Sequence, residues 1–349
     1  MARKPTLNDV VRETGLSIYT VSRALNGADG ISPASRKKVL DAAKAIGYVP
    51  NQAARALRNQ TPGPVIVTTA STSNYYYIDM IEGIQSGLRK AGISMRFADV
   101  APRGRYDPTL EDAAVAGAMQ NRAMGLISAL TLTMANYEKL TQWGVPVVFV
   151  DSRAPETDMG TASVTTDNAD ASGLVGDHLA EHGLTEWVLL AYPHRWSTRI
   201  EREQALRAAA ARHRARLTVL ECDNNPDSAR AVLDSYLAER MPSSQFALVT
   251  GNNPLLHGAL TALRSRGLRV PDDVSLVAFD EFPWAPLLDP PLTVVDEDSR
   301  SIGELAAATL ATIIARNAEA QAPSGVDYHE EDTKEVTAQL LIRQSCGCR

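Results

Sequence analysis

The stretch LNDVVRETGLSIYTVSRAL, residues 7–25, decides the fold of the N-terminal part of this chain. Asn8 and Asp9 are residue types that cap helices, and the apolar residues around them at one-turn spacing predict a short helix. Gly15 can adopt the left-handed conformation that ends a helix, and Ser17 can cap a second one. Two short helices joined by such a turn predict a helix-turn-helix, whose second helix enters the DNA major groove.

The predicted second helix has an apolar face and a polar face. Leu16, Val21 and Leu25 are expected to point inward, while Ile18 and Tyr19 begin the outer face. The outer face continues with Ser22 and Arg23. An ordinary helical hairpin would show the same pattern, so this stretch alone leaves both interpretations open.

The residues that follow carry more specific motifs. Thr20–Gly27 reads TVSRALNG, Ser32-Pro33 is a helix start, Gly47–Asn51 reads GYVPN, and Ala54–Arg58 has the form AxxLR. Together these motifs resemble the headpiece of the LacI family of bacterial repressors almost residue for residue. The resemblance favours the DNA-binding interpretation of the helical hairpin.

The resemblance implies a DNA-binding domain over residues 1–49 and a hinge helix with a linker over residues 50–62. In the family this hinge becomes helical when two subunits pair over the minor groove, where the leucine at the position of Leu57 wedges between base steps. Because so short an Ala-rich segment is marginal as an isolated helix, a plain linker is the alternative. The positions expected at DNA are Thr6, Ser17, Ile18, Tyr19, Thr20, Ser22, Arg23, Asn26, Tyr48, Asn51, Ala54 and Leu57.

From Val65 onward, short β-branched runs alternate with helical stretches. One series extends to Asp151, and a second extends from a helix near residues 168–182 to Asp280. This alternation predicts an α/β fold with doubly wound parallel sheets. Two series predict two lobes, with a ligand cleft between the carboxyl ends of their strands. The chain is therefore expected to have a small all-α head followed by a two-lobed core.

The resemblance to the LacI family covers essentially the whole chain, and its core is similar to periplasmic sugar-binding proteins. It implies that the chain crosses between the lobes three times, which we place near residues 165–168, 293–297 and 325–330. The expected core spans residues 63–349. Its N-lobe covers about 63–166 and 296–326, and its C-lobe about 167–293 and 329–345.

Candidate effector-binding residues follow the predicted strands. Tyr75 and Tyr76 begin a helix after the first strand and are expected to line the cleft, while Tyr77 fits the cleft or the core equally well. Asp151 ends another strand and is a weaker candidate. The resemblance adds Arg202, whose planar fork suits bidentate contacts, although a surface ion pair would also explain it.

Two further segments match the family in the second lobe. TGNNPLLHGAL at 250–260 places Asn252 at a ligand-contacting position, although Asn253 replaces the family's usual aspartate. VAFDEFPW at 277–284 supplies Asp280, which could accept hydrogen bonds from hydroxyls or cap a helix. Trp284 could pack on the apolar face of a sugar.

The charge distribution separates the head from the rest of the chain. The net charge is −6, but residues 1–60 hold ten Lys or Arg and four Asp or Glu, so the head carries +6 and the remainder −12. A basic module on an acidic body is typical of a DNA-binding head on a soluble core. The 44% hydrophobic and 22% charged content fits such a globular core.

The three cysteines are too few for a disulfide framework. Cys346 and Cys348 could form a metal or redox pair, but no other ligand lies near them in the sequence. We therefore expect no metal site and a frayed C-terminal tail. The chain has no apolar run of transmembrane length and no signal peptide, which favours a cytoplasmic, nucleoid-associated protein with no membrane partner.

These features favour a homodimeric transcriptional repressor that binds a palindromic operator and responds to a small polar effector, a sugar or sugar acid. A solute-binding protein of a transport system has the same core, but it needs a signal peptide and has no use for residues 1–60. An enzyme is the third class. The six histidines do not cluster in the sequence, and no nucleophile elbow, phosphate loop or metal-ligand spacing is present. We expect neither catalytic residues nor a cofactor.

Overall fold

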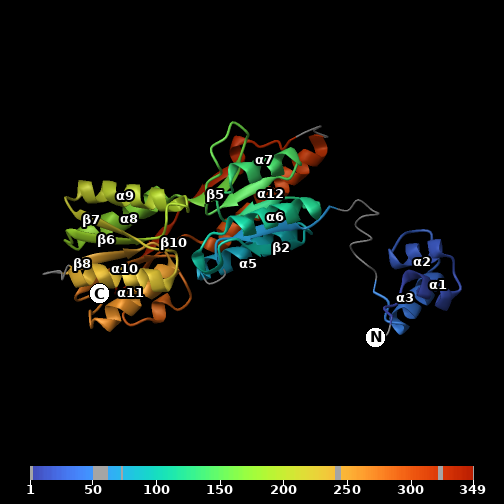
Figure 1. Ribbon diagram of the computed structural model, residues 1–349, viewed down its shortest axis with the longest axis horizontal. Coiled ribbons are helices and arrows are strands. Elements are labelled where there is room, and N and C mark those ends of the chain that lie inside the picture. The colour runs from blue at the N-terminus through green and yellow to red at the C-terminus, as the bar shows by residue number, and fades with distance from the viewer. Residues whose placement is uncertain (1–2, 50–61, 72–73, 240–244, 321–324, 349) are drawn as a thin grey trace. The chain divides into compact units, whose positions relative to one another are not determined.

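The computed structural model describes residues 3–49, 62–71, 74–239, 245–320 and 325–348. The chain divides into two compact units, Met1–Gly63 and Pro64–Arg349, which we call the head and the core (Figure 1). Among the described residues, no helix is both long and apolar enough to cross a membrane.

The head is built from α1 (Leu7–Thr14), α2 (Ile18–Leu25) and α3 (Pro33–Ala45). Its small core consists of Val10, Val21, Ala24, Val39 and Ala43. Gly15 ends α1 with a φ of 67°, and Ser17 caps α2 by accepting the Thr20 N–H at 3.1 Å, as the sequence predicts.

The start of α1 differs from the prediction. Thr6 occupies the capping position, and the Asp9 carboxylate accepts hydrogen bonds from the Thr6 N–H at 2.8 Å and its hydroxyl at 2.7 Å. The prediction that Asn8 and Asp9 are caps is therefore wrong by one turn. Asp9 supports the helix start from its third position, because a carboxylate there can reach back to the exposed N–H group.

The core contains two lobes, each with a six-stranded sheet. The N-lobe sheet is wholly parallel, with the strand order β11-β5-β4-β3-β1-β2. Its strands are β1 (Val65–Thr69), β2 (Met95–Asp99), β3 (Leu126–Ser128), β4 (Val147–Val150), β5 (Ala162–Thr166) and β11 (Thr333–Val336). Its helices are α5 (Tyr75–Lys90), η1 (Pro102–Gly104), α6 (Pro108–Gln120), α7 (Met134–Gln142), α12 (Ser299–Ala320) and η3 (Glu330–Asp332).

The C-lobe sheet has the order β12-β10-β9-β8-β6-β7, and only its edge strand β12 runs antiparallel, against β10. Its strands are β6 (Glu186–Ala191), β7 (Arg216–Glu221), β8 (Phe246–Thr250), β9 (Val274–Phe279), β10 (Thr293–Asp296) and β12 (Gln339–Leu341). Its helices are α8 (Asn168–Glu181), α9 (Thr198–Arg212), α10 (Pro226–Glu239), α11 (Asn253–Ser265) and η2 (Ala285–Leu287). Helices cover the strands of both lobes, as the predicted doubly wound fold requires (Figure 1).

The chain passes between the lobes at three places. The first follows β5 at Asp167, and the second follows β10 at Glu297 and Asp298. The third lies at Thr337 and Ala338, so its predicted position near 325–330 is wrong, as is the assignment of 333–336 to the C-lobe. Strand β11 instead extends the N-lobe sheet beside β5. This strand has only four residues, and Val336 is its one apolar residue that packs against the core, so it carries no alternating apolar pattern that the sequence would show.

The C-terminal tail is also ordered, which contradicts the predicted fraying. The N–H groups of Gln344 and Ser345 both donate to the Pro291 carbonyl, at 3.0 and 2.9 Å. The Ser345 carbonyl accepts the Leu276 N–H at 2.8 Å. Ser345 and Cys346 are buried as a result, because the tail continues the backbone pairing beyond β12.

Candidate DNA-binding and effector sites

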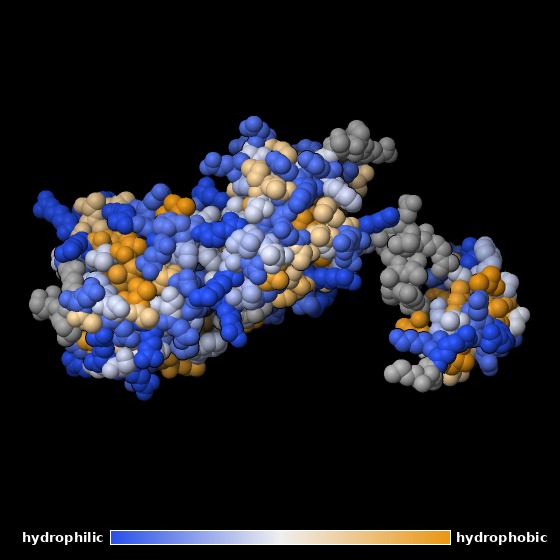
Figure 2. Space-filling model, in the orientation of Figure 1, coloured by the Kyte–Doolittle hydropathy of each residue, from blue (hydrophilic) through white to orange (hydrophobic). Residues whose placement is uncertain are grey.

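The first turn of α2 exposes two large side chains. Ile18 is 54% exposed and Tyr19 is 66% exposed, although a small domain gains stability by burying such groups. The Arg23 guanidinium lies 5.5 Å from the centre of the Tyr19 ring and donates to its hydroxyl at 3.2 Å. On the visible face of the head, apolar and strongly hydrophilic atoms are interspersed (Figure 2). This arrangement can offer both apolar and hydrogen-bonding contacts to base edges.

Other predicted DNA contacts take part in the structure of the head. The Ser17 and Thr20 hydroxyls lie 2.9 Å apart, and the Asn26 amide donates to the Ser22 hydroxyl at 3.4 Å. Tyr48 packs partly buried against the head core. Three of the predicted positions lie outside the described residues, namely Asn51, Ala54 and Leu57.

In the core, four charged side chains meet at the carboxyl ends of the strands. Asp151 follows β4, Asp280 follows β9, Glu297 follows β10, and Arg202 reaches them from α9. Their exposed fractions are 7%, 3%, 1% and 4%, respectively. So many buried charges are rare unless they are paired, and they mark a site in a protein of this fold. We call these four residues the charged cluster.

Arg202 is held by the protein on several sides. Its Nε donates to the Asn168 side chain at 2.7 Å, its Nη1 donates to the Gly251 carbonyl at 2.9 Å, and its Nη2 pairs with the Glu297 carboxylate. Its guanidinium also lies 4.2 Å from the centre of the Phe279 ring. The alternative that Arg202 forms only a surface ion pair is therefore wrong.

Burial and the neighbouring charges shift the pKa values in the charged cluster. Burial lowers the pKa of Arg202, but the carboxylate of Glu297 raises it, and the net shift is upward. Burial raises the pKa of Asp151 to about 7, although Arg202 opposes this. Burial likewise raises the pKa of Glu297 well above its usual range, and that of Asp280 to a smaller extent, again against Arg202. Burial therefore opposes ionisation of these carboxyl groups, and the nearby guanidinium of Arg202 favours it.

The two lobes share the charged cluster through hydrogen bonds. Asp280 accepts the Asn253 N–H at 3.1 Å and, from the N-lobe, the Asn74 amide at 3.4 Å. Asp151 accepts the Tyr77 hydroxyl at 3.1 Å. The sequence left open whether Tyr77 lines the cleft or packs in the core. Its side chain is buried, and its hydroxyl contacts the charged cluster.

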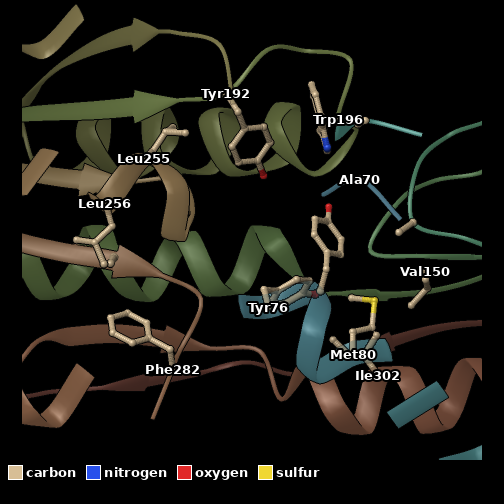
Figure 3. Close-up of a cluster of buried hydrophobic side chains, with 14 of the residues drawn as sticks. Ala70, Tyr76, Met80, Val150, Tyr192, Trp196, Leu255, Leu256, Phe282 and Ile302 are labelled. Carbon is tan, nitrogen blue, oxygen red and sulfur yellow. The ribbon is translucent and has the colours of Figure 1, made fainter. Parts of the chain in front are cut away.

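Aromatic side chains from both lobes lie close together where the lobes meet, a region that we call the junction (Figure 3). Tyr76 comes from the N-lobe, whereas Tyr192 and Trp196 come from the loop after β6 in the C-lobe. All three are buried, and the Trp196 indole nitrogen points into the junction without a hydrogen-bond partner among the described residues. The hydroxyl of Thr250 is also buried and unpaired among those residues. Buried polar groups normally have partners, so these positions suit a polar ligand or ordered water.

An open cavity of about 1040 Å³ lies beside the junction, between α5 and η1 of the N-lobe and α10 and α11 of the C-lobe. Tyr75 and Trp284, both predicted at the cleft, line it with their rings 5.1 Å apart in an edge-to-face arrangement. Asn252 instead caps α11 by accepting the Leu255 N–H at 3.1 Å, and it donates to the Asn224 side chain at 2.7 Å. Its amide is thus already used inside the C-lobe.

The sequence reasoning missed Glu297, Tyr192 and Trp196. All three follow C-lobe strands, Glu297 directly after β10 and the two aromatics shortly after β6. The same search of strand ends that selected Asp151 and Asp280 would have found them.

Further contacts hold the lobes together around the junction. Arg105 pairs with Asp223 at 3.0 Å, and the Arg195 guanidinium donates to the Thr131 carbonyl at 2.8 Å. Gly104 of η1 packs so closely on the C-lobe that an added Cβ would lie 1.7 Å from the Asn224 carbonyl oxygen. The structure therefore shows the lobes closed on each other.

This arrangement of a helix-turn-helix head and a two-lobed core is matched by known proteins. Residues 6–51 match the bacterial regulatory proteins of the lacI family, and residues 176–346 match the periplasmic binding protein-like domain. The transcriptional regulator PtxS of Pseudomonas aeruginosa is 30% identical over 345 residues, which cover 97% of this chain and 95% of PtxS. The chain belongs to the LacI family. It is a LacI-type transcriptional regulator, and the predicted family is confirmed.

Other members of the LacI family agree with this assignment. The transcriptional repressor PurR of Vibrio cholerae is 27% identical over 308 residues, covering 86% of this chain and 88% of PurR. The Lac repressor dimer bound to operator and the anti-inducer ONPF superposes with a TM-score of 0.78 at 24% identity, over 99% of both chains. The complex of the transcriptional regulator CelR with cellobiose superposes with a TM-score of 0.67 at 24% identity, over 98% of this chain and 100% of the CelR chain. The structural matches confirm the predicted fold.

Proposed function

We propose that this LacI-family regulator is a homodimeric cytoplasmic repressor that binds a palindromic operator and responds to a small polyhydroxylated effector. Residues 1–49 of the head read the operator through Ile18 and Tyr19, and residues 50–62 form the hinge. Residues 63–349, which comprise the core and the residue before it, bind the effector and pair the two subunits. The protein catalyses no reaction and works at DNA rather than at a membrane. The similarity to PurR and to the operator-bound Lac repressor dimer supports this proposal.

The observation that carries the effector proposal is the engagement of Arg202 by Glu297 inside the charged cluster. A carboxylate ligand at Arg202 would have to compete with Glu297 and would add negative charge beside Asp151 and Asp280. Hydroxyl groups, by contrast, can donate to carboxylates and accept from the Trp196 indole. We therefore favour a neutral sugar over a sugar acid. CelR, whose structure holds cellobiose, has the same fold.

The effector acts by changing how the lobes meet. Arg202 binds Asn168 just after the first crossing and Glu297 at the second, so a ligand that contacts Arg202 touches both crossings. Tyr75 and Trp284 close the outer side of the site from opposite lobes. A change of the inter-lobe angle then alters hinge formation and hence DNA affinity. Linked sites of this kind have coupling free energies of about 1–3 kcal/mol.

Two measurements with the full-length protein test the proposal. A thermal-shift screen of neutral sugars, sugar acids and nucleosides should give a hit among the neutral sugars. Selection from a random duplex library should then enrich a palindrome, whose affinity changes with that sugar and falls steeply with salt. Residues 63–349 alone should dimerise without retarding DNA. DNA binding by the isolated core, or a response to sugar acids only, contradicts the corresponding part of the proposal.

The transport alternative makes a different prediction. A solute-binding protein would bind its sugar but would show no salt-dependent affinity for a selected duplex. The match of residues 6–51 to DNA-binding regulators does not favour that alternative.

A further inference from the structure

Four potential metal ligands meet at the end of α8. They are His178, His182, Cys346 and Cys348, and one ligand atom from each lies within 4.8 Å of all the others. The Cys348 sulfur lies 3.2 Å from the Nε2 of His182 and 4.0 Å from the Nε2 of His178. Both imidazoles thus present the same ring nitrogen to the same thiol.

The local backbone explains this convergence. His178 and His182 are four residues apart at the C-terminal end of α8, so they lie on one face, with their ring centres 4.8 Å apart. The two cysteines flank Gly347, whose φ of 100° turns the chain tightly between them. The hydrogen bonds of Gln344 and Ser345 to Pro291 fix the start of this turn.

The surroundings of the four side chains also suit a metal. His178 is 6% exposed and Cys346 is 1% exposed, so the site is shielded from solvent on the side of the C-lobe. The other ring nitrogen of His178 lies 4.0 Å from the Glu181 carboxylate, and Thr293 donates its hydroxyl to the Cys346 sulfur at 3.1 Å. A hydroxyl that donates to the sulfur, as Thr293 does, orients a thiolate ligand in a metal site.

We propose that His178, His182, Cys346 and Cys348 bind one zinc ion that attaches the C-terminal tail to α8. Zinc prefers four tetrahedral nitrogen and sulfur ligands at about 2.0–2.3 Å, which gives ligand-to-ligand distances of roughly 3.3–3.8 Å. The distances of 3.2 and 4.0 Å from the Cys348 sulfur lie close to this range, and a pair separated by as much as 4.8 Å would have to approach by about 1 Å on binding. Four protein ligands leave no open position, so the ion has a structural role. Binding releases the protons of both thiols.

This zinc site is independent of effector binding. Cys346 packs beside Ser275 and Thr293, near the first residues of β9 and β10. The charged cluster lies at the opposite, carboxyl ends of the same strands, at Asp280 and Glu297. Zinc should therefore stabilise the C-lobe without being required for effector contact, and the two proposals can fail separately.

The test begins with the full-length protein purified under reducing conditions. We expect about one zinc per chain by mass spectrometry of the metal, and a tetrahedral cobalt spectrum with sulfur-to-metal charge transfer when cobalt replaces zinc. A chelator should lower the melting temperature by about 5–10 °C, and zinc should restore it. In the folded protein, zinc should also slow the reaction of the partly exposed Cys348 thiol with a thiol reagent, whereas all three thiols should react after unfolding in the presence of a chelator.

Variants separate the site from unspecific binding. The double variant Cys346→Ser/Cys348→Ser and the single variant His182→Gln should lose the zinc and the cobalt spectrum. The matched controls Cys222→Ala and His194→Gln change a buried thiol and an exposed imidazole outside the cluster, and they should keep both.

Three results would overturn the proposal. One is wild-type protein that neither retains zinc nor gives the cobalt spectrum. Another is zinc retained equally by the double cysteine variant. The third is a Cys346–Cys348 disulfide in the protein as isolated under reducing conditions, seen as the loss of two hydrogens by intact mass. The cobalt titration of the wild type needs no variant, so misfolding of a variant cannot hide the answer.

Discussion

Arg202 and Glu297 form a buried ion pair that joins α9 to the second segment by which the chain passes between the lobes. Arg202 also holds Asn168, which lies just after the first such segment. A single side chain thus connects two crossings with the candidate effector site. Because this pair is buried, we expect its loss to affect both the stability of the core and the proposed response to effector.

Substituting Arg202 by Ala should leave Glu297 as an unpaired buried carboxyl and lower the free energy of unfolding by about 3–5 kcal/mol. The effector response should disappear, because the ligand loses a donor and the crossings lose their common partner. Denaturation and calorimetry measure the two effects. Arg207→Ala is the matched control, since Arg207 lies on the same helix in a half-exposed pair with Glu203 and should cost less than about 1 kcal/mol.

The direction of the DNA effect distinguishes two kinds of effector. With an inducer, Arg202→Ala should bind operator regardless of ligand, whereas with a corepressor it should never bind. Unchanged effector affinity in this variant would remove Arg202 from the site.

The raised pKa of Asp151 should make the stability of the core depend on pH. Burial raises its pKa to about 7, whereas its ordinary value is 3.8. Between these values the unfolded chain releases a proton that the folded core retains, so the free energy of unfolding falls as pH rises from about 4 to 7. Asp151→Asn removes this titration. At pH 8 it should stabilise the core by up to about 4 kcal/mol, since each pKa unit corresponds to about 1.4 kcal/mol.

Denaturation without effector at several pH values between 5 and 8 measures how the free energy of unfolding changes with pH. For Asp151→Asn this free energy should fall less with rising pH than it does for the wild type. Asp272→Asn, which removes an exposed carboxylate of the C-lobe, should leave the slope as in the wild type. A slope for Asp151→Asn equal to that of the wild type would show that another group titrates.

A substitution of Gly104 tests whether the lobes must be closed for the effector to bind. An alanine Cβ there would lie 1.7 Å from the Asn224 carbonyl oxygen in the opposite lobe. Gly104→Ala should therefore shift the core towards an open form and weaken effector binding by about tenfold or more, equivalent to at least about 1.4 kcal/mol. Calorimetry measures the affinity, and small-angle scattering the change in shape.

Gly92→Ala is the control that separates backbone strain from the contact with Asn224. Gly92 has a φ of 71°, close to the 73° of Gly104, but a Cβ there would meet no atom within 4 Å. Gly92→Ala should cost about 1–2 kcal/mol of stability from the left-handed backbone and leave effector affinity unchanged. Equal effects on affinity in both variants would mean that closure against Asn224 is not needed.

Ile18 and Tyr19 should determine which operator is preferred. Because both are largely exposed, substitutions there should change head stability by less than about 0.5 kcal/mol. Each base contact is worth about 1–3 kcal/mol, so the variants should select a different sequence at the affected positions. Competition with a library of operator variants measures the preference. Lys90→Ala, on the core surface, should leave the operator preference unchanged. An equal loss of affinity for every duplex in the Ile18 and Tyr19 variants would contradict their role in reading the base sequence.

The head shows how much the sequence alone determined. Gly15 and Ser17 set the turn between α1 and α2 through local backbone preferences, and the apolar spacing fixed which side faces inward. Interactions within a few residues decide such features, so the sequence shows them directly. The alternation of strands and helices in the core, and with it the placement of Asp151 and Asp280 at strand ends, follows from equally local patterns.

Other features depended on the tertiary structure. Glu297 is separated from Arg202 by 95 residues, and Cys348 from His182 by 166, so no local pattern relates them. Strand β11 joins the N-lobe by pairing with β5 over four mostly polar residues, so its sequence shows no strand pattern. Local preferences act over a turn or a strand, whereas these contacts exist only once the sheets have brought distant segments together. The packing of the sheets therefore decided the partner of Arg202 and the convergence of the four candidate zinc ligands.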